Sequence, residues 1–132
     1  MSLSHPLARI STKPFGDEMQ TIITLGRVYE YSQTIGNWRT DGDDGFYLPV
    51  DVAISKERNL YVLSRGDEYM GKPRVTVLTM EEEFLWECGS GGTGDGQFVW
   101  PSGLALDSEG NVYVSDDWLH RITVFDSKGN FR

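Results

Sequence analysis

Two stretches of this chain repeat each other run by run, and this internal repeat constrains the fold more than any other feature. The segment PVDVAI, which begins at Pro49, matches PSGLAL, which begins at Pro101, and NLYVLS matches NVYVSD 52 positions later. The third runs, RVTVL at Arg74 and RITVF at Arg121, lie only 47 positions apart, so the first copy carries about five extra residues before its third run. Short runs rich in β-branched and aromatic residues, separated by turn residues, predict antiparallel strands.

The repeat predicts a meander of strands in each copy. In the first copy we expect strands at 50–54, 59–64, 74–79 and 84–89, the last of them the run FLWEC. In the second copy we expect three strands, at 104–106, 112–114 and 122–125, and the chain stops at Arg132 where a fourth would begin.

Turn chemistry differs between the two copies. The second copy places Gly110 and Gly129 where a short hairpin loop needs a positive φ angle. The first copy has no glycine in either corresponding turn. Asn59 is a residue that tolerates the left-handed conformation, but we expect the turn around Glu81–Glu83 to be looser and the first copy to be the less regular one.

Residues 94–132 also resemble the NHL repeat. The lead-in GDGQF, the Pro-x-Gly at Pro101, Asp-x-x-Gly-Asn-Val-Tyr-Val-x-Asp from Asp107 and His-Arg-Ile-x-Val-Phe-Asp from His120 all stand where that family has them. The upstream copy resembles the repeat more weakly. The resemblance implies an all-β fold made of β-propeller blades, each a four-stranded antiparallel meander, with about two blades in this chain. It does not fix a function, because such blades occur in binding modules and in enzymes.

The ends of the chain do not complete the blades. Two strand-like runs at 20–25 and 27–35 are split by Gly26, and the second resembles an outer blade strand without the rest of its blade. The predicted organisation is a flexible N-terminal arm at 1–18, strands including this orphan outer strand at 19–36, blade 1 at 37–89, and blade 2 without its outer strand at 90–132.

This imbalance predicts assembly, because propellers remove exposed strand edges by closing a ring. The strand at 27–36 would complete the last blade of a neighbouring copy. Three chains would then give a six-bladed ring, the size common in the family that the chain resembles, and two would give a tight four-bladed ring. The alternative is that the chain is a fragment of a longer propeller protein, which does not exclude assembly.

Composition limits the partners. Twelve Lys and Arg against twenty Asp and Glu give a net charge of −8, which argues against nucleic acid and against an anionic membrane surface. The single Cys88 lies in an apolar run and is interpreted as a buried small hydrophobe rather than a reactive thiol. The N-terminus lacks the apolar core of a signal peptide, which predicts a cytoplasmic location; a leader removed before this sequence begins would leave no trace in it.

The loops between the second and third strands of each blade, and those between blades, should emerge on one face, which we call the loop face. Aromatic side chains mixed with both signs of charge are typical of recognition surfaces. The alternative for Trp100 and Trp118 is that they pack between neighbouring blades. The candidate binding residues on the loop face are Trp38, Arg39, Tyr47, Arg65, Asp67, Tyr69, Trp100, Asp117, Trp118 and His120.

Two acidic patterns invite a metal or catalytic interpretation that the residues do not favour. The stretch DGDDG from Asp41 resembles a calcium loop, but the twelfth position is Val52, so the closing carboxylate is missing. Asp116 and Asp117 beside His120 suggest a carboxylate–imidazole site. The favoured interpretation is that Asp116 accepts backbone N–H groups in its loop, because this Asp and the His-Arg pair belong to the repeat pattern itself.

The sequence shows no nucleophile motif, metal-ligand spacing or phosphate loop, so we expect no catalytic residues, no metal and no cofactor. The function predicted is a non-catalytic interaction module that binds a protein or small molecule on its loop face, as the resemblance to NHL propellers also implies. The alternative is a fragment of a metal-dependent six-bladed propeller enzyme of the lyase or lactonase type.

Overall fold

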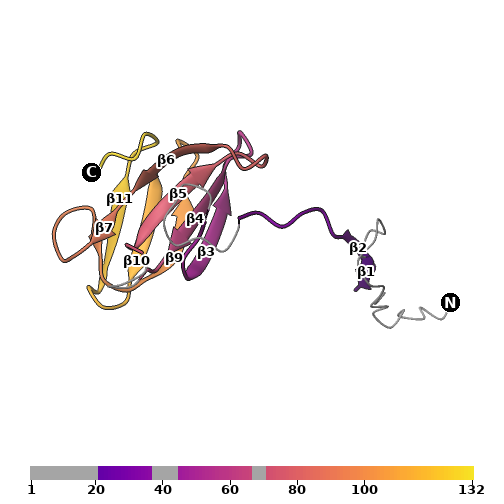
Figure 1. Ribbon diagram of the computed structural model, residues 1–132, viewed down its shortest axis with the longest axis horizontal. Coiled ribbons are helices and arrows are strands. Elements are labelled where there is room, and N and C mark those ends of the chain that lie inside the picture. The colour runs from indigo at the N-terminus through magenta and orange to yellow at the C-terminus, as the bar shows by residue number, and fades with distance from the viewer. Residues whose placement is uncertain (1–20, 37–44, 67–70) are drawn as a thin grey trace. The chain divides into compact units, whose positions relative to one another are not determined.

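The computed structural model describes residues 21–36, 45–66 and 71–132. Every regular element in these ranges is a β-strand (Figure 1), as the repeat predicted. Within the same ranges, no helix has the length and apolar character needed to cross a membrane. The chain divides into two units, one ending at Thr34 and one running from Ile35 to Arg132, and each is described here by itself.

The first unit contains a β-hairpin. Strands β1 (Thr21–Thr24) and β2 (Arg27–Glu30) pair antiparallel, with Thr21 opposite Glu30. Leu25 and Gly26 form the two-residue loop with φ angles of 49° and 74°, the left-handed pair that a tight hairpin requires. Residues 27–30 are therefore hydrogen-bonded to β1 along one edge. The predicted arm at 1–18 lies outside the described residues, and the role of residues 27–36 as an outer blade strand stays a prediction.

The second unit contains two antiparallel meanders, which confirms the predicted fold class (Figure 1). Blade 1 has four strands and blade 2 has three, each paired with the next along the chain. A short parallel pair lies in the connection between the blades. The strands are β3 (Pro49–Ile54), β4 (Leu60–Ser64), β5 (Arg74–Leu78) and β6 (Phe84–Cys88) in blade 1, β7 (Ser90–Gly91) and β8 (Gln97–Phe98) in the connection, and β9 (Pro101–Leu106), β10 (Val112–Asp116) and β11 (Arg121–Phe125) in blade 2.

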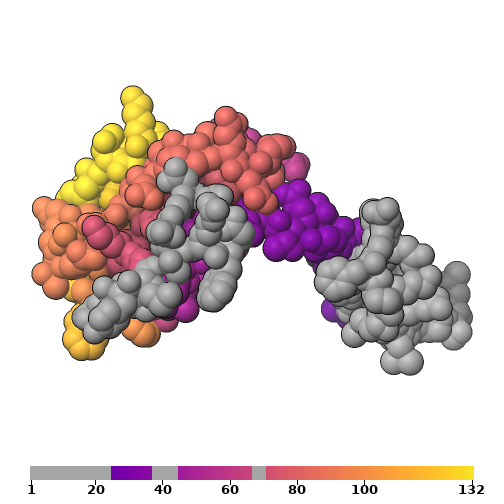
Figure 2. Space-filling view, viewed as in Figure 1, coloured from indigo at the N-terminus to yellow at the C-terminus, as the bar shows by residue number. Residues whose placement is uncertain are grey.

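Blade 2 begins a fourth strand at its last residues. Phe131 forms an antiparallel bridge with Phe125, as Phe84 does with Leu78 at the start of β6. The backbone N–H of Arg132 donates to the carbonyl of Val124 over 3.0 Å. The C-terminal residues lie at the surface (yellow in Figure 2). The repeat therefore extends to the fourth strand with its register unchanged.

The main core lies between the two blades. Alternate residues of β4 and β5, such as Leu63 and Val75, pack against Val112, Val114 and Phe125 of blade 2, all nearly inaccessible to solvent. Burial of this kind stabilises the pair by about 25 cal/mol for each Å² of apolar surface removed from water. A smaller core covers the other face of blade 1, where Leu60, Val62 and Leu78 pack with Ile35, Phe46 and Met80.

Four turns share the same hydrogen-bond geometry, namely those that join the first strand of each blade to the second and the third to the fourth, and this corrects two expectations. Arg58 and Glu82 adopt φ angles of 65° and 68°, at the positions where blade 2 has Gly110 and Gly129. Asn59 does not take the left-handed conformation, and the turn around Glu82 closes with a 2.9 Å bond from Thr79 N–H to the carbonyl of Glu83. Blade 1 keeps the regular turn at the cost of two left-handed non-glycine residues.

A side-chain oxygen at the first position of each turn explains this regularity. In blade 2, Asp107 accepts the N–H groups of Glu109 and Asn111, and Asp126 makes the matching bonds at the next turn. In blade 1, Ser55 and Thr79 supply hydroxyl acceptors instead. Because each turn carries its own acceptor, its shape does not depend on glycine.

Candidate binding groove

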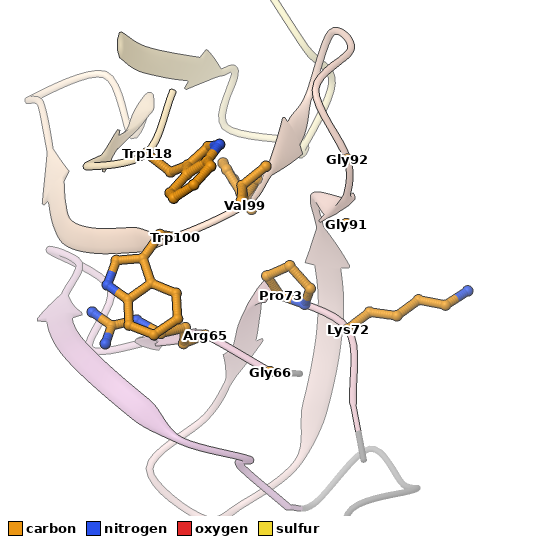
Figure 3. Close-up of a pocket in the computed structure, with 10 residues that line it drawn as sticks. Arg65, Gly66, Lys72, Pro73, Gly91, Gly92, Val99, Trp100 and Trp118 are labelled. Atoms are coloured by element: carbon orange, nitrogen blue, oxygen red, sulfur yellow. The ribbon is translucent and has the colours of Figure 1, made fainter. Parts of the chain in front are cut away.

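A groove of about 580 Å³ opens between the two blades on the loop face (Figure 3). Three of the predicted residues line it together: Arg65, Trp100 and Trp118. The tryptophan side chains are 51% and 70% exposed, so neither is buried between these two blades. The remaining lining residues are Gly66, Lys72 and Pro73 from the β4–β5 loop, and Gly91, Gly92, Phe98 and Val99 from the connection between the blades.

Asp116, at the end of β10, holds both tryptophan-bearing segments in place. One carboxylate oxygen accepts the N–H groups of Val99 at 2.8 Å and Trp100 at 3.1 Å, and the other accepts those of Trp118 at 3.0 Å and Leu119 at 2.9 Å. The side chain is buried, which strengthens such charge-assisted bonds. This arrangement confirms the interpretation of Asp116 as a backbone acceptor and ties together the backbone segments that carry Trp100 and Trp118.

Arg65 joins blade 1 to the groove wall of blade 2. Its guanidinium carbon lies 4.3 Å from the ring centroid of Trp100, within the range of a cation–π interaction. Its Nε donates to the carbonyl of Pro101 over 3.2 Å. The backbone supports the same contact region, because the N–H of Asp117 donates to the Trp100 carbonyl over 3.0 Å. Trp100 is therefore contacted from both blades, at its ring by Arg65 of blade 1 and at its carbonyl by Asp117 of blade 2.

The glycine-rich connection gives the groove its floor. Gly89 has a φ angle of 88°, and a Cβ atom there would overlap the ring of Phe98, which is fully buried. Arg121 fastens the far side of the same connection by donating to the carbonyls of Thr93 and Gln97. The connection is thus a rigid, close-packed segment, with the glycines at Gly91 and Gly92 facing the groove.

Two other predicted residues lie at a separate hollow. Asp117 and His120 line a surface depression of about 530 Å³ with Ser115, Arg121 and Ile122. Asp117 accepts a hydrogen bond from the Ser102 hydroxyl at 2.8 Å. Within the described ranges, no three His, Cys, Asp or Glu side chains are grouped as metal ligands would be.

The remaining predictions divide by where the residues fall. Tyr47 is described and half-buried, outside the residues that line the groove. Four predicted residues lie outside the described ranges: Trp38, Arg39, Asp67 and Tyr69. Sequence reasoning missed the groove residues Gly66, Lys72, Pro73, Gly91, Gly92, Phe98 and Val99. The available signal was the insertion that ends at Pro73, together with the glycine-rich connection, which was interpreted only as a link between strands.

Comparison with known proteins agrees with this architecture. A family model described as the NHL repeat matches residues 98–125. The chain is 38% identical over 113 residues to NHL repeat-containing protein 3 of Homo sapiens, which covers 85% of this chain and 32% of that protein. It is 27% identical over 118 residues to the Mus musculus protein of the same name, covering 89% and 33%. It is 40% identical over 53 residues to B-box type zinc finger protein ncl-1 of Caenorhabditis elegans, covering 39% and 6%.

The chain spans about a third of the length of the two NHL repeat-containing relatives. The matched segment runs from Phe98, in the floor of the groove, to Phe125, at the end of β11, and so contains Trp100, Asp116 and Trp118. Two of the motif carboxylates quoted above have structural partners: Asp107 accepts N–H groups within its turn, and Asp116 accepts those beside the two tryptophans. Residues 98–125 are an NHL repeat, and the chain belongs among the NHL-repeat proteins.

Proposed function

We propose that this chain is a non-catalytic interaction module whose partner docks on the loop face, with the groove between the blades as the anchor point. One observation carries the proposal: two exposed tryptophan side chains stand at one groove, and their backbones are fixed by a single buried carboxylate, that of Asp116. Rigid aromatic surface of this kind supplies contact area at little cost in conformational entropy.

The shape of the groove and its apolar lining support the same proposal. The groove is concave, mostly apolar in its lining and preformed, as ligand sites usually are. The ring of Trp118 is exposed to solvent, and the backbone N–H of Trp118 is held by Asp116. A partner that covers this ring therefore does not have to order the loop backbone first. NHL repeats in the proteins that this chain resembles act as interaction surfaces, which supports a partner of protein character.

The proposal is tested by selecting peptides from a random display library and titrating them into ¹⁵N-labelled protein. The tryptophan indole N–H signals report the location of binding. We expect the signals of Trp100 and Trp118 to move and that of Trp86, half-buried between the blades, to stay. Selected peptides that shift backbone signals only at the Asp107 and Asp126 turns, on the opposite face, would refute the choice of face. A library that yields no binder would refute the interaction role.

We also propose that the open side of blade 2 is closed by another copy of the chain. Apart from the bridge between Phe125 and Phe131, the outer edge of β11 has no strand partner among the described residues. Ile122, on the outer face of blade 2, is 64% exposed. Exposed edges and apolar blade faces favour association. The segment at 27–36 is the candidate strand, and three copies would supply six blades.

A further inference from the structure

The two ends of the groove carry the same sign of charge. Of the described residues that line it, only Arg65 and Lys72 are charged. Figure 3 shows the Arg65 guanidinium beside Trp100 at one end, and Lys72 extending outward at the other. Between them lie uncharged side chains, among them Pro73 and Val99. The groove therefore has a cationic group at each end and an apolar middle.

Neither cation is neutralised within the described part of the chain. Arg65 uses its Nε on the Pro101 carbonyl, and its two terminal nitrogens have no carboxylate partner among the described residues. Two described carboxylates of blade 2 do not line the groove: Asp116 is occupied by four backbone N–H groups, and Asp117 accepts from Ser102. In a chain of net charge −8, two cations at one groove with no carboxylate partner among the described residues are complementary to an anionic partner.

The middle of the groove has room for a short stretch of polypeptide. Its volume of about 580 Å³ is within the range that takes a small ligand, roughly two or three side chains of a peptide. Gly91 and Gly92 present no side chains at the wall, so a partner's main chain can approach closely there. The indole rings of Trp100 and Trp118 offer flat apolar faces, on which proline and aliphatic side chains pack well.

We infer that the groove binds an extended segment of a partner protein in which a short apolar or proline-containing centre is flanked on both sides by carboxylates. The inference rests on the proposed function and names the chemical class of the partner. The apolar centre lies between Trp100, Trp118 and Pro73. One carboxylate pairs with the Arg65 guanidinium, and one at the other end pairs with Lys72.

Three fluorescent peptides of equal length test this chemistry by polarisation. The first is Glu-Glu-Pro-Leu-Pro-Glu-Glu, the second replaces each Glu by Lys, and the third replaces the Pro-Leu-Pro centre by three Ser. We expect the first to bind at least about tenfold more tightly than either of the others. Its binding weakens as salt is added, because charge pairs at a surface are screened.

Two groove variants and two matched controls locate the binding. Trp118→Ala removes an exposed ring whose backbone is held independently, and Lys72→Glu reverses one end charge. Each is expected to weaken binding of the first peptide by about tenfold or more. Leu85→Ala, at an exposed apolar side chain of β6, and Lys128→Glu, which makes the same charge change at a turn on the opposite face, are expected to leave it unchanged.

The outcomes separate this inference from the proposed function. If the basic peptide binds best and Trp118→Ala abolishes that binding, the acidic partner is wrong and the docking site stands. If the acidic peptide binds but neither groove variant weakens it, the groove is not its site and the inference fails. If no peptide binds, and a single-stranded oligouridylate binds only to protein with an intact Trp118, both the inference and the protein-interaction role fail.

Discussion

At the residue scale, the geometry of the groove depends most on Asp116. Four backbone N–H groups converge on its carboxylate, two from each of the segments that carry Trp100 and Trp118. Any change at Asp116 therefore acts on stability and on the backbone segments that carry the two tryptophans together.

We expect Asp116→Asn to lower the free energy of unfolding by about 3 kcal/mol, because its amide NH₂ group would face two N–H donors in a buried site. Chemical denaturation monitored by circular dichroism measures the change. The matched variant Asp117→Asn, at an exposed carboxylate that accepts one hydroxyl, should cost less than about 1 kcal/mol. Equal losses in the two variants would show that the four bonds contribute little.

Cys88 is a buried core residue rather than a reactive thiol. It is 6% exposed and packs between the blades, and burial raises the pKa of its thiol to about 12. The thiolate is the reactive form, so we expect no reaction with a disulfide reagent at pH 8 in the native protein and complete reaction after denaturation. Rapid modification of native protein would mean that the blades separate on the time scale of the reaction.

At the scale of elements, the hairpin turns are the most informative part of the chain. Glu82 and Arg58 hold left-handed conformations that an L-residue adopts at a cost of roughly 1 kcal/mol. Blade 2 avoids this cost with Gly129 and Gly110. The same turn thus exists in a strained and a relaxed version within one chain.

We expect Glu82→Gly to raise the free energy of unfolding by about 0.5 kcal/mol, since relief of the left-handed strain exceeds the added chain entropy. The reciprocal change Gly129→Ala should destabilise by more than about 1 kcal/mol, because its Cβ would lie 2.9 Å from the Trp86 ring. Thermal denaturation compares them. Glu81→Gly, in the same turn at an ordinary φ angle, is the control and should destabilise.

The Asp107 turn adds a pH dependence to blade 2. A hydrogen bond from the Asn111 side chain, with further N–H and hydroxyl donors, lowers the pKa of Asp107 to about 2. Because the unfolded carboxyl has a pKa of about 3.9, this contribution to stability is complete above that pH and is lost as pH falls toward 2. Asp107→Asn should flatten the stability curve between those values, which acid unfolding at fixed denaturant would measure.

Most of the fold was predictable from local pattern, and the reasons are physical. The runs beginning at Pro49 and Pro101 alternate with turn residues, and strand pairing in a meander is between neighbours in sequence, so short-range signals suffice. The turn at Ser55–Asn59 was predicted, but its left-handed residue, Arg58, was not, because a serine acceptor at Ser55 replaces the glycine signal. The groove was predicted only in part, since Lys72 and Val99 meet it through packing between blades, which no local pattern encodes.

At the scale of the whole molecule, the two blades form one packed unit with unequal sides. One side of blade 1 has its own small core with Ile35 and Phe46, whereas blade 2 leaves Ile122 open on its outer face. The innermost strands are joined directly, because the Asp51 carboxylate accepts the N–H of Leu104 at 2.7 Å. A blade that follows blade 2 would meet Gly103 at the position of Asp51, and so would lack this bond.

We expect the purified chain to associate, with light scattering giving a mass near three times its 14.9 kDa. The open edge of β11 and the exposed outer face of blade 2 provide the driving force. Removal of residues 1–36 should cause aggregation or lower the melting temperature. A monodisperse monomer at micromolar concentration, or a deletion variant with unchanged mass and melting, would contradict ring closure between copies.

The shared geometry of the four turns has a consequence for counting repeats. Blade 1 has Ser55, Arg58 and Glu82 where blade 2 has Asp107, Gly110 and Gly129, yet its turns keep the same backbone geometry, and the family model matches residues 98–125, in blade 2 and the connection before it. A search by consensus sequence will therefore undercount the blades of a protein whose turns lack the consensus glycines. Counting blades by the backbone geometry of their turns, instead of by consensus residues, would recover blades such as blade 1.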